Sequence, residues 1–440
     1  MFIYYYYLLE VMVELNFEPI FPKYGLKSNP YFIEALLVEG GTIPIETLVG
    51  REKEKQELHR LISLGGGQRI MVVGEAGVGK TSLVNYIRAK AKKASYFSPN
   101  NEIGIMDNWK VNDVIINTLQ AVYLELKNQD IKITDPKLLL ALEDLFELSR
   151  IVQDMDVDTE ALMTINTQSL MEIFRKIVNE LTNRGYRAII IHYNNLDNID
   201  DKEYLIRLLN NLRDFFNNTH SIFIFIGDET LPSVINVKSR LRQIFTTPIK
   251  VPILDYEEVK NVIDIRLNEL RLSEANTVIR PHSEDSLKLL YDLYQGNIRD
   301  ILNSLSSSVN EKNVVTLSAV MTKQVLKEKA TSLFIEKMSP TELKVLLYVL
   351  EKGSVNNKEI AENLKKLPQN ISSYIYKLRD ELKAIKVDKV EGTKIYYKPT
   401  TEAIWLKLKI TEQELIREKN NQNKRLIELQ KRVIDYSKNP

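Results

Sequence analysis

The 440-residue chain contains no cysteine and only four histidines. The lack of cysteine excludes disulfides, thiolate zinc sites and cysteine nucleophiles, and it fits a reducing compartment. With so few histidines, a metal site built from imidazole ligands is not expected. Neither charge is in excess, since the formal net charge is +1. This balance argues against a chain that binds nucleic acid over its whole surface.

Long apolar runs are also missing. No stretch approaches the roughly 18 consecutive apolar residues of a membrane span. The apolar opening, residues 1–15, carries Glu10 and Glu14 and lacks a basic leading region, which does not fit a signal peptide. We therefore expect a cytoplasmic protein.

Proline- and glycine-rich stretches and changes in hydrophobic periodicity divide the chain. Its length predicts about three folding units. Residues 15–48 carry enough proline and glycine to predict an N-terminal arm or linker at 1–48 rather than a packed core. Continuous apolar runs alternate with helical patterns over 49–254, which predicts an α/β doubly wound parallel sheet. An all-helical lid is expected at 255–330, a winged helix-turn-helix at 331–410 and a charged helix at 411–440. The expected strands are 69–74, 102–106, 187–193, 221–227 and 246–254, and long helices are expected at 110–127 and about 135–183.

Residues 74–81, GEAGVGKT, fit the phosphate-loop pattern G-x-x-x-x-G-K-[ST] between a predicted strand and a predicted helix. Its glycines let the backbone turn N–H groups toward phosphate oxygens, and the following helix adds its positive end. Lys80 is expected to reach the β and γ phosphates, and the Thr81 hydroxyl to bind Mg²⁺. The sequence thus predicts ATP and Mg²⁺ as ligands. The expected contacts are Gly74, Glu75, Ala76, Gly77, Val78, Gly79, Lys80, Thr81 and Ser82.

The strand at 187–193 ends in NNLD, where a phosphate-loop enzyme usually has an acidic pair. Asn194 and Asn195 occupy these positions. An amide oxygen can order a magnesium-bound water but cannot act as a general base, so we expect hydrolysis to be slow. Asp197 could take over the metal role, although a cap of the next turn is the plainer interpretation.

Further candidates follow the strand at 221–227. Asp228 or Thr230 would lie beside the γ phosphate. Arg240 and Arg242 stand where such ATPases often present an arginine to a neighbouring subunit, although an unengaged surface arginine is an equal alternative for each. Arg299, just inside a helix after the turn at 296–297, could fold back over the phosphates.

Five segments, in their order along the chain, resemble the AAA+ ATPases. They are VGRE at 49–52, GEAGVGKT, the strand before NNLD, SRLRQIF at 239–245 and GNIRD at 296–300. The similarity is greatest to the branch that contains the archaeal origin-recognition initiators and related archaeal and signalling ATPases, and it covers about residues 49–400. It implies that Val49, Gly50 and Arg51 line the adenine pocket and that Arg299 is the lid sensor. It also implies that Arg240 or Arg242 is an arginine finger in a self-association through the ATPase core. The missing acidic pair departs from the family pattern.

The unit at 331–410 has three helical patterns and then two alternating strands around Gly392. Short polar side chains at the start of its third helix, with cations after them, suit the major groove and its phosphates. Residues 338–410 hold 14 Lys and Arg against 9 Asp and Glu, a local charge of +5. A protein-docking role is the alternative, because winged helices also serve that purpose. The candidate DNA contacts are Gln369, Asn370, Ser372, Ser373, Tyr374, Lys377 and Arg379, with Lys389 and Lys394 on the wing.

Two function classes follow from these motifs. The first is a nucleotide-controlled DNA-binding switch, either replication-initiator-like or a regulator of a mobile element. The second is a signalling or defence ATPase of the STAND type, in which the winged helix makes protein contacts instead.

Overall fold

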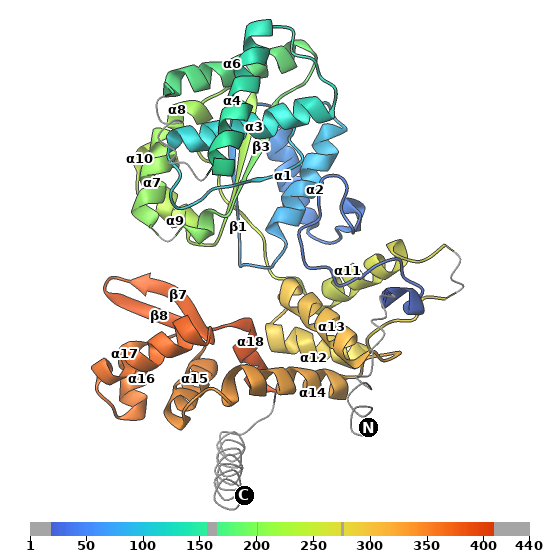
Figure 1. The fold of residues 1–440 in the computed structure, drawn as a ribbon, viewed down its shortest axis with the longest axis vertical. Helices are drawn as coiled ribbons and strands as arrows, with labels where there is room; N and C mark the ends of the chain where they lie inside the picture. Colours follow the sequence, from blue (N-terminus) through green and yellow to red (C-terminus); the bar gives the residue numbers. More distant parts are fainter. Residues whose placement is uncertain (1–18, 156–164, 200, 274–276, 409–440) are drawn as a thin grey trace, which may run out of the picture.

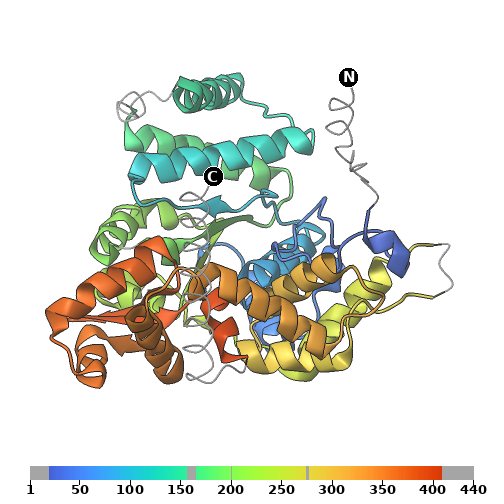
Figure 2. The ribbon, with the colours of Figure 1, turned by 60° about the horizontal axis from the view of Figure 1, so that its bottom comes forward.

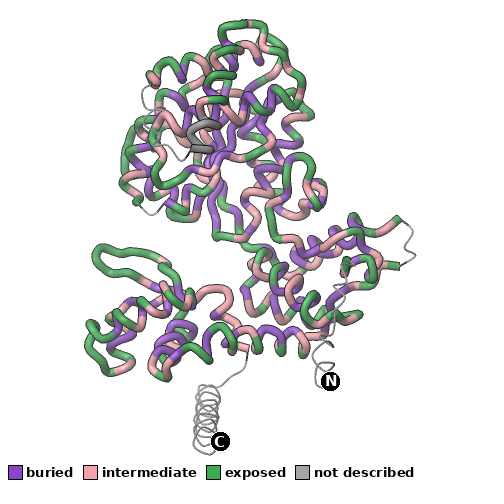
Figure 3. The backbone as a smooth tube through the Cα atoms, viewed as in Figure 1, coloured by how far each residue is buried: buried purple, intermediate pink, exposed green. Residues whose placement is uncertain are grey.

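The computed structural model describes residues 19–155, 165–199, 201–273 and 277–408. The predicted helix at 411–440 and the opening residues 1–18 lie outside this part of the chain. Figure 1 shows the α/β part above two smaller parts, one helical and one that combines helices with the strands β7 and β8. Figure 3 shows the buried residues gathered along the sheet and at the centres of these parts.

A five-stranded parallel sheet confirms the predicted α/β fold. Its strand order is β2-β3-β4-β1-β5. All carboxyl ends therefore lie at one edge, where Val73 pairs with Gly227 and Gly104 with Asn194. The two outer strands are shorter than predicted. The strands are β1 (Gln68–Val73), β2 (Ile103–Gly104), β3 (Ile189–Asn194), β4 (Ser221–Gly227) and β5 (Ile249–Lys250).

Helices cover both faces of this sheet, because alternate strand residues face opposite sides. Ile190 joins the cluster under α1 (Glu52–Ser63) and α2 (Lys80–Lys92), whereas Ile191 joins the cluster on the other face. The larger second cluster includes α3 (Val111–Asn128), α4 (Pro136–Met155), α6 (Thr167–Asn183) and α7 (Lys202–Asn211). Three short helices follow: α8 (Arg213–Phe216), α9 (Leu231–Asn236) and α10 (Ser239–Arg242).

A helical unit follows β5 and begins at a capping box. The Asp255 side chain accepts from Glu258 N–H at 2.8 Å, and the Glu258 side chain accepts from Asp255 N–H at 2.9 Å. Its helices are α11 (Tyr256–Glu269), α12 (Glu284–Tyr294), α13 (Ile298–Lys312) and α14 (Ala319–Ala330).

The described part of the predicted arm, residues 19–48, packs into the core of this helical unit. Only two short 3₁₀ turns form, η1 (Phe21–Tyr24) and η2 (Ile45–Thr47), yet Tyr24 and Tyr31 are almost fully buried. The expectation that this segment contains too much proline and glycine to pack into a core is wrong. Proline and glycine prevent regular backbone here, but they do not prevent aromatic side chains from being buried between helices.

The C-terminal unit, residues 331–408, begins where α14 runs on through η4 (Thr331–Ile335). It contains the three predicted helices and an antiparallel sheet of order β6-β8-β7, seen beside the helical unit in Figure 2. The short β6 was not predicted. The elements are α15 (Pro340–Lys352), β6 (Val355–Asn356), α16 (Asn357–Leu364), α17 (Pro368–Tyr376), η5 (Lys377–Glu381), β7 (Ile385–Glu391), β8 (Lys394–Pro399), α18 (Thr401–Ile404) and η6 (Trp405–Lys407).

None of the helices in the described ranges has the length and hydropathy of a membrane span.

Candidate functional site

The phosphate loop joins β1 to α2 at the carboxyl edge of the sheet. Gly77 and Gly79 have φ of 86° and 93°, values that side chains rarely adopt. A Cβ atom on Gly74 would lie 2.5 Å from the backbone oxygen of Val251. Glycine is therefore required both by the turn of the loop and by its packing on the segment after β5.

Lys80 begins α2 and is 7% exposed. Its ammonium donates to the backbone oxygens of Gly74 at 2.8 Å and Glu75 at 2.9 Å. Burial lowers the pKa of Lys80, while the charges of Asp197 and Asp228 act to raise it. A buried cation that donates to uncharged carbonyls, next to backbone N–H groups at a helix start, fits the triphosphate of a nucleotide.

The amide pair lies at the end of β3, but its two members face different neighbours. The Asn194 side chain donates to Thr81 Oγ1 at 3.3 Å, so it lies beside the predicted metal-binding hydroxyl. Asn195 has a left-handed backbone (φ 66°), and its amide nitrogen lies 3.1 Å from where Gly104 of β2 would carry a Cβ. Asn194 thus lies beside the hydroxyl predicted to bind Mg²⁺, and Asn195 lies toward the β2 edge.

Two carboxylates flank this edge. Asp228 follows β4, and because Val73 pairs with Gly227, it lies level with the first glycine of the loop. Its Oδ1 accepts from both the N–H (2.9 Å) and the hydroxyl (2.6 Å) of Thr230, so the Thr230 hydroxyl turns toward Asp228. Asp197 lies in η3 (Leu196–Asn198), and its charge acts on Lys80. Magnesium prefers such oxygen ligands.

The residues expected at the adenine base lie between α1 and the helical unit. Val49 packs against the core of the helical unit, and a Cβ on Gly50 would lie 3.1 Å from Glu258 Oε1. The buried Arg51 guanidinium donates to the backbone oxygens of Val78 and Pro252. Arg51 therefore holds the phosphate loop in place, a role that the motif alone did not predict.

Ser82 is turned away from the loop, because its hydroxyl accepts from Leu36 N–H at 3.1 Å. Asn85 of α2 in turn donates to the Leu36 oxygen at 3.0 Å. The Ser82 hydroxyl, which was expected to contact nucleotide, is therefore already bonded to residues 19–48.

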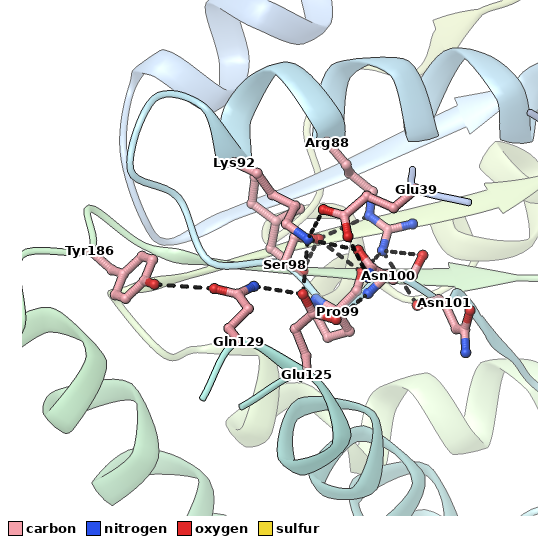
Figure 4. A network of polar contacts seen from close by, with 11 residues as sticks. Glu39, Arg88, Lys92, Ser98, Pro99, Asn100, Asn101, Glu125, Gln129 and Tyr186 are labelled. Carbon is pink, nitrogen blue, oxygen red and sulfur yellow. Dashed lines mark hydrogen bonds and ion pairs between the residues drawn. The ribbon is translucent and has the colours of Figure 1, made fainter. Parts of the chain in front are cut away.

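Figure 4 shows the polar network that anchors this same side of α2. Lys92 lies between Glu39 and Glu125, at 2.8 Å from each. The fully buried Arg88 donates to Ser98 at 3.0 Å and lies 3.1 Å from His192 Nδ1. Burial and Arg88 hold the pKa of His192 well below its usual range, so the imidazole is neutral and accepts. The network fixes β3 two residues before Asn194.

The first turn of α13 touches the phosphate loop. Asn297 donates its side-chain N–H to the Ala76 oxygen at 2.8 Å, and Arg299 Cβ lies 3.0 Å from where Gly77 would carry a Cβ. The structure thus brings Arg299 beside the loop, as the predicted sensor requires. Asn297 was not predicted as a site residue, although the turn at 296–297 was the signal that could have identified it.

Arg240 and Arg242 lie on α10 with exposed side chains, while Leu241 between them is buried. Within the described ranges neither guanidinium makes a hydrogen bond or an ion pair. Both therefore lie on the surface and contribute none of the contacts that hold the phosphate loop.

In the C-terminal unit, the start of α17 presents a polar surface. Gln369, Asn370, Ser372 and Ser373 are exposed, whereas Ile371 is buried against the core of the unit. Tyr374 is half-buried and accepts from Lys366 at 3.1 Å. The predicted donors therefore share one accessible face.

The predicted cations of this region are mostly paired with acids. Lys377 lies 3.0 Å from Glu342 of α15, and Arg379 lies 2.7 Å from Asp380. On the hairpin, Lys389 pairs with Glu391 at 2.7 Å, whereas Lys394 is exposed. The charge available to a phosphate backbone is thus smaller on the third helix than its sequence suggests.

The phosphate loop lies within a segment that matches a known family. Residues 47–224, which contain β1 to β3, the loop and the first part of β4, match the family model described as "AAA ATPase domain". This segment is an AAA ATPase domain. The family's fold implies nucleotide binding, in agreement with the geometry of the loop. No curated protein matches the sequence.

Solved structures similar to the chain include two proteins of Aeropyrum pernix and one of Thermotoga maritima. The A. pernix ORC2 protein (ADPNP–ADP complexes) is 14% identical, with 91% of this chain and 100% of that chain covered and a TM-score of 0.47. The A. pernix ORC1 protein in complex with DNA is 14% identical, with 82% and 92% covered and a TM-score of 0.42. The T. maritima RuvB Holliday junction branch migration motor is 13% identical, with 82% and 96% covered and a TM-score of 0.39. All three scores lie below 0.5, so the family match alone identifies the domain.

Proposed function

We propose that the protein is a cytoplasmic switch in which ATP and Mg²⁺ at the phosphate loop control duplex-DNA binding by a winged helix-turn-helix at 331–410. The observation that best supports a switch is the contact between Asn194 and Thr81. A complete phosphate-binding loop there meets a neutral amide instead of an acid. Such a site keeps the groups that bind nucleotide and lacks a charged base for the attacking water.

In this proposal Lys80 holds the β and γ phosphates, and Thr81 holds Mg²⁺ with help from Asp197. Bound Mg²⁺ would neutralise phosphate charge. Arg299 would face the phosphates from α13, and Arg240 or Arg242 would face the nucleotide of a second copy. Loss of one well-placed catalytic group slows a reaction by about a hundredfold or more, so bound ATP would persist.

The DNA side of the proposal rests on the exposed polar face of α17 and on the wing lysines. Short polar side chains on an accessible helix suit base edges, and the local charge of +5 over residues 338–410 suits phosphates.

A second candidate is a STAND-type signalling ATPase whose C-terminal unit binds protein. The pairing of Lys377 with Glu342 and Arg379 with Asp380 favours it, because paired cations contribute little to phosphate binding. Exposed apolar side chains in the same unit also favour it, with Leu367 67% and Val390 62% exposed.

Duplex-DNA binding measured by filter retention at about 50 mM and 200 mM salt separates the two candidates. The switch predicts measurable affinity that falls steeply with salt. Absence of binding at the lower salt, by protein shown to hold labelled ATP, would reject DNA as the ligand and favour the second candidate.

A further inference from the structure

The C-terminal unit is attached to the helical unit at two places. Along the chain, α14 continues through η4, so that Ala330 already belongs to the core of the C-terminal unit. At the other end, Trp405 packs against the cores of both units. Because the C-terminal unit is attached to the helical unit at both of these places, a rotation of the helical unit would also move the C-terminal unit.

The second attachment contains two hydrogen bonds. The Thr401 hydroxyl donates to Asp300 Oδ2 at 3.2 Å, and the Trp405 indole N–H donates to the Tyr294 hydroxyl. Tyr294 is buried and also bonds Ser304 at 2.6 Å. Burial raises the pKa of Asp300, while the Thr401 hydrogen bond and the charge of Lys386 lower it. The Asp300 carboxylate thus depends on partners from the C-terminal unit.

Asp300 lies in the same helical turn that touches the phosphate loop. Asn297 caps this turn by accepting from Asp300 N–H at 3.4 Å, and its other side-chain atom donates to Ala76 O at 2.8 Å. The fit is close, because a Cβ on Gly77 would lie 2.5 Å from Asn297 Oδ1. One rigid turn therefore contacts the loop with Asn297 and the C-terminal unit with Asp300.

We propose that Asn297, Asp300 and Thr401 form a relay that couples the phosphate loop to the orientation of the C-terminal unit. Phosphates would bind the backbone of the same loop that Asn297 contacts, so loop and turn must adjust together. The turn then shifts Asp300 against Thr401, since a helix moves as a body. The proposal rests on the proposed function for its two ligands, ATP and duplex DNA. Coupling of this kind is reciprocal, so DNA would also change the affinity for ATP.

Trp405 gives a readout that needs no DNA. The chain has only two tryptophans, Trp109 and Trp405, so Trp109→Phe leaves Trp405 as the single indole reporter, in the same attachment as the relay contact. Addition of Mg-ATP to this variant should change the Trp405 emission. A protein that binds labelled ATP but shows no change in emission would overturn the relay. Lys80→Ala in the same background checks that the signal requires bound nucleotide.

Thr401→Val removes the donor and keeps the side-chain shape, and Thr401→Ser restores the hydroxyl. We expect Val to reduce the emission change at least fivefold and Ser to retain it, with ATP affinity within about twofold of the parent in both. The fivefold figure is the lower end of typical couplings between sites. Asn297→Ala removes the relay contact at the loop and should reduce the emission change as Thr401→Val does. This variant tests the relay if Thr401→Val does not fold. A full emission change in both Val and Ala variants would reject the relay.

The DNA measurement distinguishes failure of the relay from failure of the proposed function. In the parent protein, Mg-ATP should change duplex affinity by about 5- to 150-fold, and Thr401→Val should bring this factor close to one. If the parent binds no DNA but its Trp405 signal depends on Thr401, the relay stands and the DNA-binding proposal fails. If ATP changes DNA affinity equally in the parent and in Thr401→Val, the DNA switch stands and the relay fails.

Discussion

The side-chain amide of Asn194 lies 3.3 Å from the hydroxyl of Thr81. In phosphate-loop enzymes, the position beside this hydroxyl normally holds an acid that orders a metal-bound water. An amide carries no charge and here donates its N–H to the hydroxyl, so in the proposed switch ATP would be retained rather than rapidly hydrolysed.

The first prediction concerns hydrolysis. Asn195→Glu should raise the single-turnover rate with labelled ATP, toward the roughly hundredfold effect of a positioned general base. Asn198→Glu, an exposed position in η3, adds the same charge nearby and should leave the rate unchanged. Brisk hydrolysis by the natural protein would contradict the prediction, and Asp197→Asn and Asp228→Asn would then identify the acid.

Lys80 should dominate nucleotide affinity. Lys80→Ala removes the cation that is expected to face the β and γ phosphates, and a hydrogen bond to a charged group is worth about 1.5–3 kcal/mol, or roughly 10- to 150-fold in affinity. Calorimetry with Mg-ATP measures the loss. Lys90→Ala on the exposed side of the same helix is the matched control. Equal affinity in the two variants would refute the phosphate-loop assignment.

The wing lysines should contribute to DNA binding without reading sequence. Replacing Lys389 and Lys394 by Gln should reduce the slope of log affinity against log salt by about 0.9 for each phosphate that the protein no longer neutralises. Lys352→Gln, at the end of α15, is the control. An unchanged slope in the double variant would exclude the wing from the interface.

Lys377 should matter for stability, because it faces Glu342. Burial alone would raise the pKa of Glu342, but hydrogen bonds from Ser339 and Lys377 bring it below its usual value. The ionised carboxylate therefore stabilises the fold above its ordinary pKa, and this contribution is lost as the pH falls through the lowered value. In urea unfolding, Glu342→Gln should cost about 1 kcal/mol at pH 7 and progressively less in acid.

Glu351→Gln, near the exposed end of α15, is the control for removing one carboxylate from the same helix. If Lys377→Gln instead leaves stability unchanged and weakens DNA binding, the phosphate contact first predicted for Lys377 is favoured over its structural role.

Residues 19–48 should stabilise the helical unit through Tyr31. Its hydroxyl lies 2.6 Å from His282 Nδ1, and burial lowers the pKa of His282 to about 3, so the neutral imidazole accepts. Tyr31→Phe leaves this buried nitrogen without a donor and should cost about 1–3 kcal/mol. Urea unfolding compares it with Tyr376→Phe, whose side chain is 57% exposed. Equal stabilities would show that the Tyr31 hydroxyl contributes nothing.

The sequence predicted the sheet and most helices because their signals are local. Apolar runs such as 221–227 and the capping box at Asp255 need only neighbouring residues to be recognised. The phosphate loop is likewise a contiguous motif, and the structure places it between β1 and α2 as predicted.

Contacts between distant segments could not be predicted in this way. Asn297 is 221 residues from Ala76, and Lys377 is 35 residues from Glu342. Which residues meet depends on how helices pack, and the sequence of one helix does not encode the position of another. For the same reason, a lysine expected at phosphate was found beside a glutamate.

The burial of residues 19–48 also has a consequence for synthesis. Tyr31 precedes its partner His282 by 251 residues, a separation that a ribosome covers in roughly 10 to 50 seconds at about 5–20 residues per second. Throughout that interval the aromatic side chains of the segment have no core to enter, although the ATPase sheet can already form. The nascent chain therefore presents an apolar segment that chaperones are suited to shield until the helical unit emerges.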